Sequence, residues 1–208
     1  MRSNIQSDGQ SSRSFIETAR RAQIIECAVE TIAELGYAQT SLAKIAKRAG
    51  ISAGVISYYF DGKDDLIAEV VAHVFAVGEA FIRARVGEQA SARETLRAFI
   101  EASIAYIGAH PQNGLAVMNI IRAGRTEQGD QRFDPTVGES RRDAITRICE
   151  WGQREGEFRA FAIPVVRVAL IEALDAAPQE LALDPDLDMA ALGRELAELF
   201  DRATRADS

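Results

Sequence analysis

Apolar residues recur at spacings of three and four along nearly the whole chain, which is the period of an amphipathic α-helix. No run alternates apolar and polar residues convincingly, as a half-buried β-strand would. Glycine and proline interrupt the pattern at intervals that suit helices of about two to six turns. The pattern therefore predicts an all-α protein of about nine helices, over residues 15–35, 41–48, 53–59, 63–85, 92–109, 112–124, 139–155, 164–176 and 188–203.

Several residues predict where these helices begin and end. Thr40 and Ser52 directly precede the second and third helices, and both carry the hydroxyl that an N-cap requires. Gly50 follows the second helix and permits the left-handed backbone with which many helices end. Two segments rich in glycine, aspartate or proline, 126–138 and 177–187, are predicted loops.

Charge is distributed unevenly along the chain, whose formal net charge is −7. Residues 36–63 contain all three lysines of the chain and one arginine against a single aspartate. The remainder beyond residue 66 is acidic. A short basic segment on an acidic body is compatible with nucleic-acid binding, because phosphate affinity depends on the local field rather than on total charge.

Composition indicates the class and location of the protein. The two cysteines cannot form a disulfide scaffold and suggest a reducing compartment. No stretch reaches the roughly 18 apolar residues of a membrane span. The polar segment 1–13 lacks the apolar core of a secretory signal and is expected to be a disordered tail. We therefore expect a cytoplasmic protein without a membrane segment.

The clearest motif is TSLAKIAKRAGISAGVISYYFDGK, residues 40–63. Ala46, Gly50 and Ile56 supply a small residue, a turn glycine and a buried aliphatic side chain in the order that two steeply crossing helices need. This spacing predicts a helix-turn-helix, whose second helix enters the major groove of DNA with its N-terminal residues near the bases.

The exposed positions of this motif suit contacts with DNA. Ala53 and Gly54 are small enough to let the backbone approach a duplex, and Lys63 adds a charge at the start of the next helix. Hydroxyl groups for bases or phosphates come from Ser52, Ser57, Tyr58 and Tyr59. The alternative interpretation makes the two tyrosines core aromatics. For Lys44, Lys47 and Arg48, an ordinary solvated face remains an equal alternative to direct contact.

Residues 20–66 resemble the DNA-binding domain of the tetracycline-repressor (TetR) family. The matching motifs are LGYAQTS, IAKRAGIS and G-x-x-S-Y-Y-F-x-x-K-D-D-L. Ser57 stands where the family often has an aromatic residue, and in this the chain resembles the branch of the choline-responsive repressor BetI. Beyond residue 70 the resemblance is one of length and number of helices.

The resemblance implies a homodimer in which a helix-turn-helix domain over 14–62 binds a palindromic operator. A second domain over 63–208 would bind a small organic effector and dimerise, and effector binding would release the DNA. The DNA contacts that the resemblance implies are Thr40, Ser41, Ala53, Gly54, Val55, Ser57, Tyr58, Tyr59 and Lys63.

Candidates for the effector pocket and the dimer interface follow from the predicted helices. Mixed aromatic and polar residues suit a small-molecule pocket, namely Phe99, Ser103, Tyr106, Met118, Asn119, Arg122, Trp151 and Arg167. Apolar stripes on the last two helices suit a dimer interface, namely Val166, Leu170, Leu174, Leu192, Leu196, Leu199 and Phe200. In both cases the alternative is packing within the protomer's own core. The acidic body could favour a cationic ligand, or be a solvated surface.

No enzyme motif, cofactor fingerprint or metal site is expected. Asp184, Asp186 and Asp188 follow the spacing of a calcium loop, but Met189 occupies the position of its required glycine. A loop followed by a helix N-cap explains the same residues. We expect a ligand-responsive regulator, most simply a repressor; the alternative is a helical small-molecule-binding protein that does not bind DNA.

Overall fold

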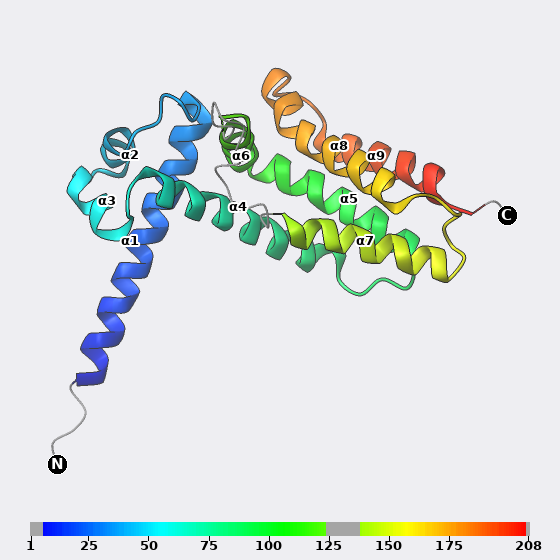
Figure 1. The fold of residues 1–208 in the computed structure, drawn as a ribbon, viewed down its shortest axis with the longest axis horizontal. Helices are drawn as coiled ribbons and strands as arrows, with labels where there is room; N and C mark the ends of the chain where they lie inside the picture. Colours follow the sequence, from blue (N-terminus) through cyan, green and yellow to red (C-terminus); the bar gives the residue numbers. More distant parts are fainter. Residues whose placement is uncertain (1–5, 124–137, 207–208) are drawn as a thin grey trace, which may run out of the picture.

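The computed structural model describes residues 6–123 and 138–206, with side chains from residue 16 onward. Within these ranges every helix or strand of more than one residue is an α-helix, as the apolar pattern predicts (Figure 1). They are α1 (Gln6–Leu35), α2 (Leu42–Ala49), α3 (Ala53–Tyr59), α4 (Lys63–Val86), α5 (Ala92–Ala109), α6 (Pro111–Ala123), α7 (Glu139–Arg154), α8 (Ile163–Leu183) and α9 (Met189–Thr204). Apart from Gly138, the predicted loop over 126–138 lies outside the described residues. In the part of the chain described, no helix combines the length and apolar composition needed to cross a bilayer.

The turn between α2 and α3 closes through backbone hydrogen bonds. Gly50 adopts the left-handed conformation, with φ of 67°, and its N–H points to the carbonyls of Ala46 and Lys47. The N–H of Ile51 donates to the Ala46 carbonyl at 3.0 Å. These bonds satisfy carbonyls at the end of α2 that otherwise have no partner, and they fix the direction in which α3 leaves.

The cap of α2 is Ser41 rather than the predicted Thr40. The Ser41 hydroxyl accepts the N–H of Lys44, whereas Thr40 is buried and donates its hydroxyl to the Gly36 carbonyl at 2.8 Å. The inward turn of Thr40 therefore moves the cap by one residue. Ser52 occupies the N-cap position of α3, as predicted, but its side chain makes no capping hydrogen bond.

One hydrophobic cluster unites the N-terminal helices with α6. Ile32 of α1, Ile45 of α2 and Ile56 of α3 are fully buried in it, together with Ile120 of α6. The N-terminal core therefore does not end at residue 62, where the sequence predicts the domain boundary, because α6 returns to pack on α1.

A second cluster joins α5 with α7, α8 and α9. Leu96, Ile100 and Ile104 line one side of α5, and Ile145 and Leu170 face them from α7 and α8. In Figure 1, α4 runs from the N-terminal helices into this C-terminal bundle without an intervening linker.

Two predicted boundaries differ from the structure. Residues 6–13, expected in a disordered tail, form the first turns of α1; they contain no proline, and each added residue contributes another helical hydrogen bond. Residues 177–183, expected in a loop, continue α8 through Pro178. The missing N–H of an internal proline costs about 3 kcal/mol. Burial of the Pro178 ring beside Gly114 of α6 offsets that cost.

The acidic loop before α9 behaves as a helix cap. Asp188 accepts the N–H of Ala191 at 2.9 Å, and Asp184 accepts the N–H of Asp186 at 3.2 Å. These bonds agree with the loop-and-cap interpretation of the aspartate spacing.

Candidate functional site

The first turn of α3 presents small residues to solvent. Ser52, Ala53 and Gly54 are exposed, while Ile56 on the opposite face is fully buried. Tyr58, one turn further along, has 73% of its surface exposed. The helix therefore has one face packed in the core and one face free to enter a groove.

The other predicted DNA contacts differ in accessibility. Ser41 and Ser57 are exposed, although the Ser57 hydroxyl lies 3.3 Å from the Ala53 carbonyl, to which it donates. Val55 and Tyr59 are half-buried. Thr40 is 3% exposed, so the structure contradicts its predicted contact with DNA.

Tyr59 and Lys63 both have structural partners. The Tyr59 ring packs against the N-terminal core and meets the Tyr58 ring edge-on, with centroids 5.0 Å apart. Lys63 Nζ donates to the Tyr37 carbonyl at 3.0 Å and lies 4.0 Å from the centre of the Tyr37 ring. Tyr58 is thus the more accessible tyrosine, and the core interpretation holds in part for Tyr59.

Arg21 of α1 holds the end of α3, a role that sequence reasoning missed. Its Nη1 donates to the Tyr59 carbonyl at 2.7 Å, and its Nη2 lies 3.0 Å from a carboxylate oxygen of Glu69 on α4. Gln23, on the same helix, donates to the Ala49 carbonyl at the end of α2. One helix therefore satisfies the terminal carbonyls of both helices of the motif. No local signal predicts this, because Arg21 and Tyr59 are 38 positions apart.

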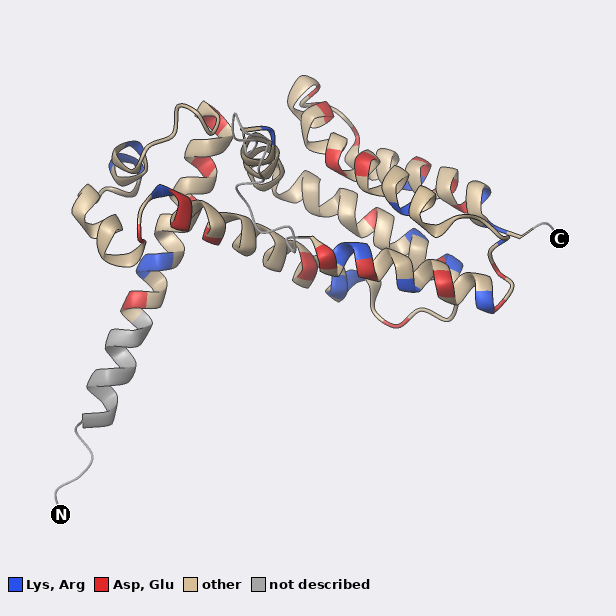
Figure 2. Cartoon of the chain, viewed as in Figure 1, with Lys and Arg blue, Asp and Glu red and all other residues tan. Residues whose placement is uncertain are grey.

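Figure 2 shows basic positions on α2, and their side chains differ in the contacts that they make. Arg48 forms ion pairs with Glu30, at 3.0 Å, and with Glu34, so it ties α2 to α1. Lys44 donates to the Gln39 carbonyl at 2.6 Å, and Lys47 is exposed. Lys44 and Arg48 are exposed as well, but their charged groups are engaged in the contacts above.

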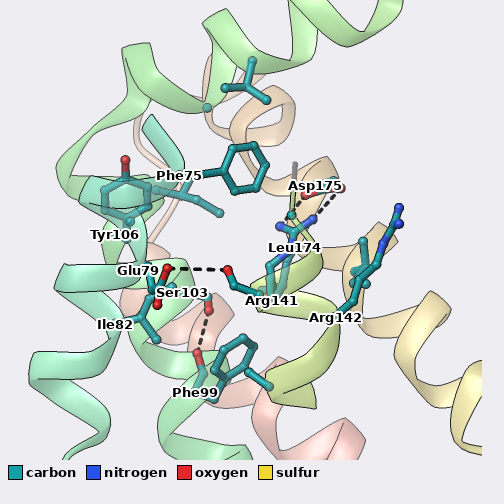
Figure 3. A pocket seen from close by; sticks show the side chains of 18 of the residues that line it. Phe75, Glu79, Ile82, Phe99, Ser103, Tyr106, Arg141, Arg142, Leu174 and Asp175 are labelled. Carbon is teal, nitrogen blue, oxygen red and sulfur yellow. Dashed lines mark hydrogen bonds and ion pairs between the residues drawn. The ribbon is translucent and has the colours of Figure 1, made fainter. Parts of the chain in front are cut away.

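Helices α4 to α8 line a cavity of about 1200 Å³ that is open to solvent on one side (Figure 3). Most of the predicted pocket residues line it, namely Phe99, Ser103, Tyr106, Met118, Arg122 and Trp151. Asn119 does not, because it faces α1 and donates to the Ile32 carbonyl at 3.1 Å. Arg167 also lies outside, donating to the Thr146 hydroxyl at 3.1 Å.

The buried polar groups of the cavity already have partners in the protein. The Ser103 hydroxyl donates to the Phe99 carbonyl at 2.7 Å. The Tyr106 hydroxyl donates to the Val74 carbonyl at 3.1 Å and accepts from Asn113 at 2.9 Å. Burial raises the pKa of Tyr106. This part of the wall therefore presents mainly hydrocarbon to an occupant.

The predicted dimer stripes lie mostly inside the protomer. Leu170, Leu174 and Phe200 are buried in the C-terminal cluster, which contradicts an interface role. Half-buried side chains that pack against the same cluster are Val166, Leu192 and Leu196. Of the predicted set, only Leu199 is exposed, at 61%. The outer face of α8 instead presents Val165 and Val168.

The N-terminal helices match a known family model. Residues 24–70 match the model described as bacterial regulatory proteins, tetR family. The chain is 42% identical over 87 residues to the HTH-type transcriptional regulator BetI 1 of Chromohalobacter salexigens, a match covering 41% of this chain and 43% of that protein. It is 41% identical over 85 residues to BetI of Paraburkholderia xenovorans, covering 40% and 44%. Over these residues the chain is therefore similar to regulators of the tetR family, and BetI proteins are among the relatives that it resembles there.

The match spans less than half the length of these relatives. Solved structures of transcriptional regulators share the fold of most of the chain. The ketosteroid regulator KstR2 of Mycobacterium tuberculosis superposes with a TM-score of 0.74 at 20% identity, covering 90% of this chain and 96% of KstR2. FadR from Bacillus halodurans superposes with a TM-score of 0.78 at 24% identity, covering 88% of this chain and 94% of that FadR. FadR from Bacillus subtilis, solved with stearoyl-CoA, superposes with a TM-score of 0.75 at 24% identity, covering 86% of this chain and 96% of that FadR. At these identities the likeness shows the fold alone.

The TetR-family match covers α2, α3 and the turn between them, together with the end of α1 and the start of α4. Arg21 and Gln23 precede the matched residues by only a few positions. The related proteins of matching sequence are named as transcriptional regulators, not as enzymes.

Proposed function

We propose that this protein is a ligand-responsive transcriptional repressor that binds a palindromic DNA operator as a homodimer and is released by a small-molecule effector. The observation that carries the proposal is the exposed first turn of α3, with Ala53 and Gly54 outward, on a motif whose helix ends are held by α1. A recognition helix needs both features, because it must reach the base edges and keep its orientation there.

The charge arrangement supports this use of α3. Exposed cations and hydroxyls near α3 include Ser41, Lys47 and Tyr58. Such groups bind phosphates and set the register on a duplex, while the small side chains of α3 approach the bases. One such helix reads only a few base pairs, so a specific operator calls for two copies.

A second copy would use the outer face of the last two helices. Val165 and Val168 on α8 are 67% and 55% exposed, and Leu199 on α9 is also exposed. Such apolar side chains are favourable at a symmetric interface, where they would be covered by the same residues of the partner.

The cavity and the N-terminal core share residues, which supports control by an effector. Val71 and Val74 of α4, with Val117 and Ile120 of α6, belong to both. The Asn119 amide joins α6 directly to the Ile32 carbonyl at the end of α1. An occupant that displaces α4 or α6 therefore acts on the platform that holds α3, since packed cores transmit displacement.

The test is a gel shift with the DNA upstream of the protein's own gene. Tyr58→Ala is expected to weaken operator affinity about tenfold, the equivalent of one charge-assisted hydrogen bond. Leu183→Ala, equally exposed at the end of α8, is the matched control and is expected to leave affinity unchanged. Affinity should also fall with salt, at a log–log slope of about 0.9 for each phosphate contact. A salt-independent complex would contradict the proposal.

A second candidate function rests on the cavity alone. A volume of about 1200 Å³ between α4 and α8 also suits a helical small-molecule-binding protein that does not regulate transcription. Saturable ligand binding together with no salt-dependent DNA binding would favour that function.

A further inference from the structure

We propose that the effector is an anionic amphiphile, an elongated apolar molecule with a carboxylate or phosphate head. The inference rests on the proposed function in one respect, namely that an effector occupies the cavity between α4 and α8. It is carried by the charges in the cavity wall, by an unsatisfied arginine nitrogen and by the length of the apolar lining.

Arginines outnumber acids in the wall of the cavity. Two arginines have carboxylate partners: Arg83 pairs with Glu79, and Arg141 pairs with Asp175. These pairs largely cancel their own charge.

The remaining lining charges are mainly positive. Arg122, Arg142 and Arg147 have no carboxylate within ion-pair distance in the described part of the chain, and the remaining lining acid is Glu172. Arg122 donates to the amide oxygen of Gln179, which is a neutral partner. The charged residues that line the cavity within the described part of the chain are therefore net positive, opposite in sign to the chain, whose net charge is −7. A cleft with low-dielectric walls focuses such a local field on an entering ligand.

Arg141 provides a second, independent indication. Its Nη1 and Nη2 donate to the two carboxylate oxygens of Asp175 at 2.8 and 3.0 Å. Its Nε is buried and has no hydrogen-bond partner within the residues described. A buried donor without an acceptor costs about 1–3 kcal/mol, so an anionic oxygen at this position would relieve that cost. Figure 3 shows Arg141, Arg142 and Asp175 on one side of the cavity, away from Tyr106 and Ile82.

The rest of the lining suits a long apolar body. Along α4 the lining residues run from Val71 to Val86, which corresponds to about 22 Å of helix. Phe75, Ile82 and Phe99 contribute hydrocarbon along this length. A cavity of about 1200 Å³ exceeds the usual range of about 300–1,000 Å³ for drug-sized ligands.

These features disfavour a small cation such as choline. A quaternary ammonium ion is held by aromatic faces and nearby negative charge, whereas the charges in excess in this lining are guanidinium groups. The BetI-like resemblance covers less than half of the chain, so it does not extend the choline response to this cavity. The proposal therefore opposes a cationic ligand and is consistent with the other interpretation of the acidic body, a solvated surface.

The experiment compares ligands of matched chain length and different charge. Trp151 lines the cavity and is the single tryptophan of the chain, so its fluorescence reports occupancy without DNA. Laurate, lauroyl-CoA, dodecyltrimethylammonium and choline are titrated into the full-length protein below micelle-forming concentrations. Laurate or lauroyl-CoA should bind saturably and at least tenfold more tightly than dodecyltrimethylammonium, with no response to choline. Tighter binding of lauroyl-CoA would assign a phosphate-bearing head, and tighter binding of laurate a free carboxylate.

The variant Arg142→Gln/Arg147→Gln should lower affinity for the anionic probe at least tenfold, and it should not weaken binding of the cationic probe, because it removes positive charge from the cavity wall. Both arginines are exposed, so the fold should be retained. Arg154→Gln is the matched control, since this arginine lies on the same helix outside the cavity and pairs with Glu155. Two results with the wild-type protein would overturn the proposal. One is that the cationic probe binds as tightly as the anionic probes or more tightly, and the other is that no probe binds. If the protein binds the anionic probes selectively but binds no DNA, the proposed ligand class is supported and only the proposed regulatory function is contradicted.

Discussion

The two hydrophobic clusters differ in where they leave space. The N-terminal cluster fills its interior with residues such as Ile45 and Ile56 and presents small side chains outward at Ala53 and Gly54. The C-terminal helices instead line a cavity of about 1200 Å³ beside the core of α5. Protein interiors normally contain few voids larger than a water molecule. The proposed effector would fill this space, whereas the N-terminal core, within the described residues, has no room for a ligand.

The two regions also differ in what relatives reveal. Residues 24–70 match a family model, whereas the C-terminal helices share only a fold with solved structures. Binding to a regular duplex restricts the shape and spacing of a recognition motif. A cavity for a small molecule restricts only its own lining, so its residues can vary with the ligand.

The largest expected effect separates DNA binding from folding in the N-terminal region. Gly54→Glu places a negative charge on the exposed start of α3 and should lower operator affinity roughly a hundredfold, since like charges facing each other cost several kcal/mol. A Cβ at this position meets only the Ser52 hydroxyl, at 3.7 Å, so stability should be preserved. Gel shifts and thermal unfolding measure the two effects. A large decrease in the melting temperature would show that this substitution does not separate DNA binding from folding stability.

The next prediction concerns the packing beside the cavity. A Cβ on Gly114 would lie 2.6 Å from Cγ and 2.8 Å from Cβ of Pro178, so Gly114→Ala must push α6 and α8 apart. Overpacking of this kind costs about 1–3 kcal/mol, measurable by urea denaturation. Gly54→Ala is the control, since the same substitution there meets no close contact and should be neutral or stabilising. Equal stability of the two variants would contradict the close approach of α6 and α8.

A smaller effect depends on pH. Arg93 donates to both carboxylate oxygens of Asp201 at 2.9 Å, which lowers the pKa of Asp201. Because the folded pKa lies below the unfolded value, the stabilisation is complete above about pH 4 and is lost as pH falls through the folded pKa. Arg93 is partly exposed, so Asp201→Asn should cost only about 1 kcal/mol at pH 7.

Urea denaturation at pH 7 and at successively lower pH measures this difference. The gap in unfolding free energy between wild type and Asp201→Asn should narrow on acidification. A gap that widens would show that the ion pair is not its cause.

The smallest expected effect compares one cysteine from each region. Burial raises the pKa of Cys149 to about 11, and burial with the nearby Glu30 carboxylate raises the pKa of Cys27. Cys149 is fully buried and Cys27 only half-buried. Iodoacetamide at pH 8 should therefore modify Cys27 before Cys149, since the exposed thiolate is the reactive form. Mass spectrometry gives the order, and equal rates in the native protein would contradict it.

Local pattern determined most of the fold. The turn glycine, the caps and the apolar periodicity act within one or two helical turns, so the positions of α2, α3 and α5 follow from the sequence. The errors occurred where a tertiary contact overrides local preference. Pro178 remains helical because it packs against Gly114, a residue far away in sequence.

The amino-acid sequence by itself determined the helices, the helix-turn-helix and its likeness to the TetR family, because these depend on neighbouring residues. Only the tertiary structure decided that Leu170 and Leu174 face inward, that Arg21 holds α3, and that arginines outnumber acids in the described lining of the cavity. A helix with apolar residues on several faces can be buried on any of them. Its rotation is fixed by partners many residues away, so no local pattern predicts which side chains meet.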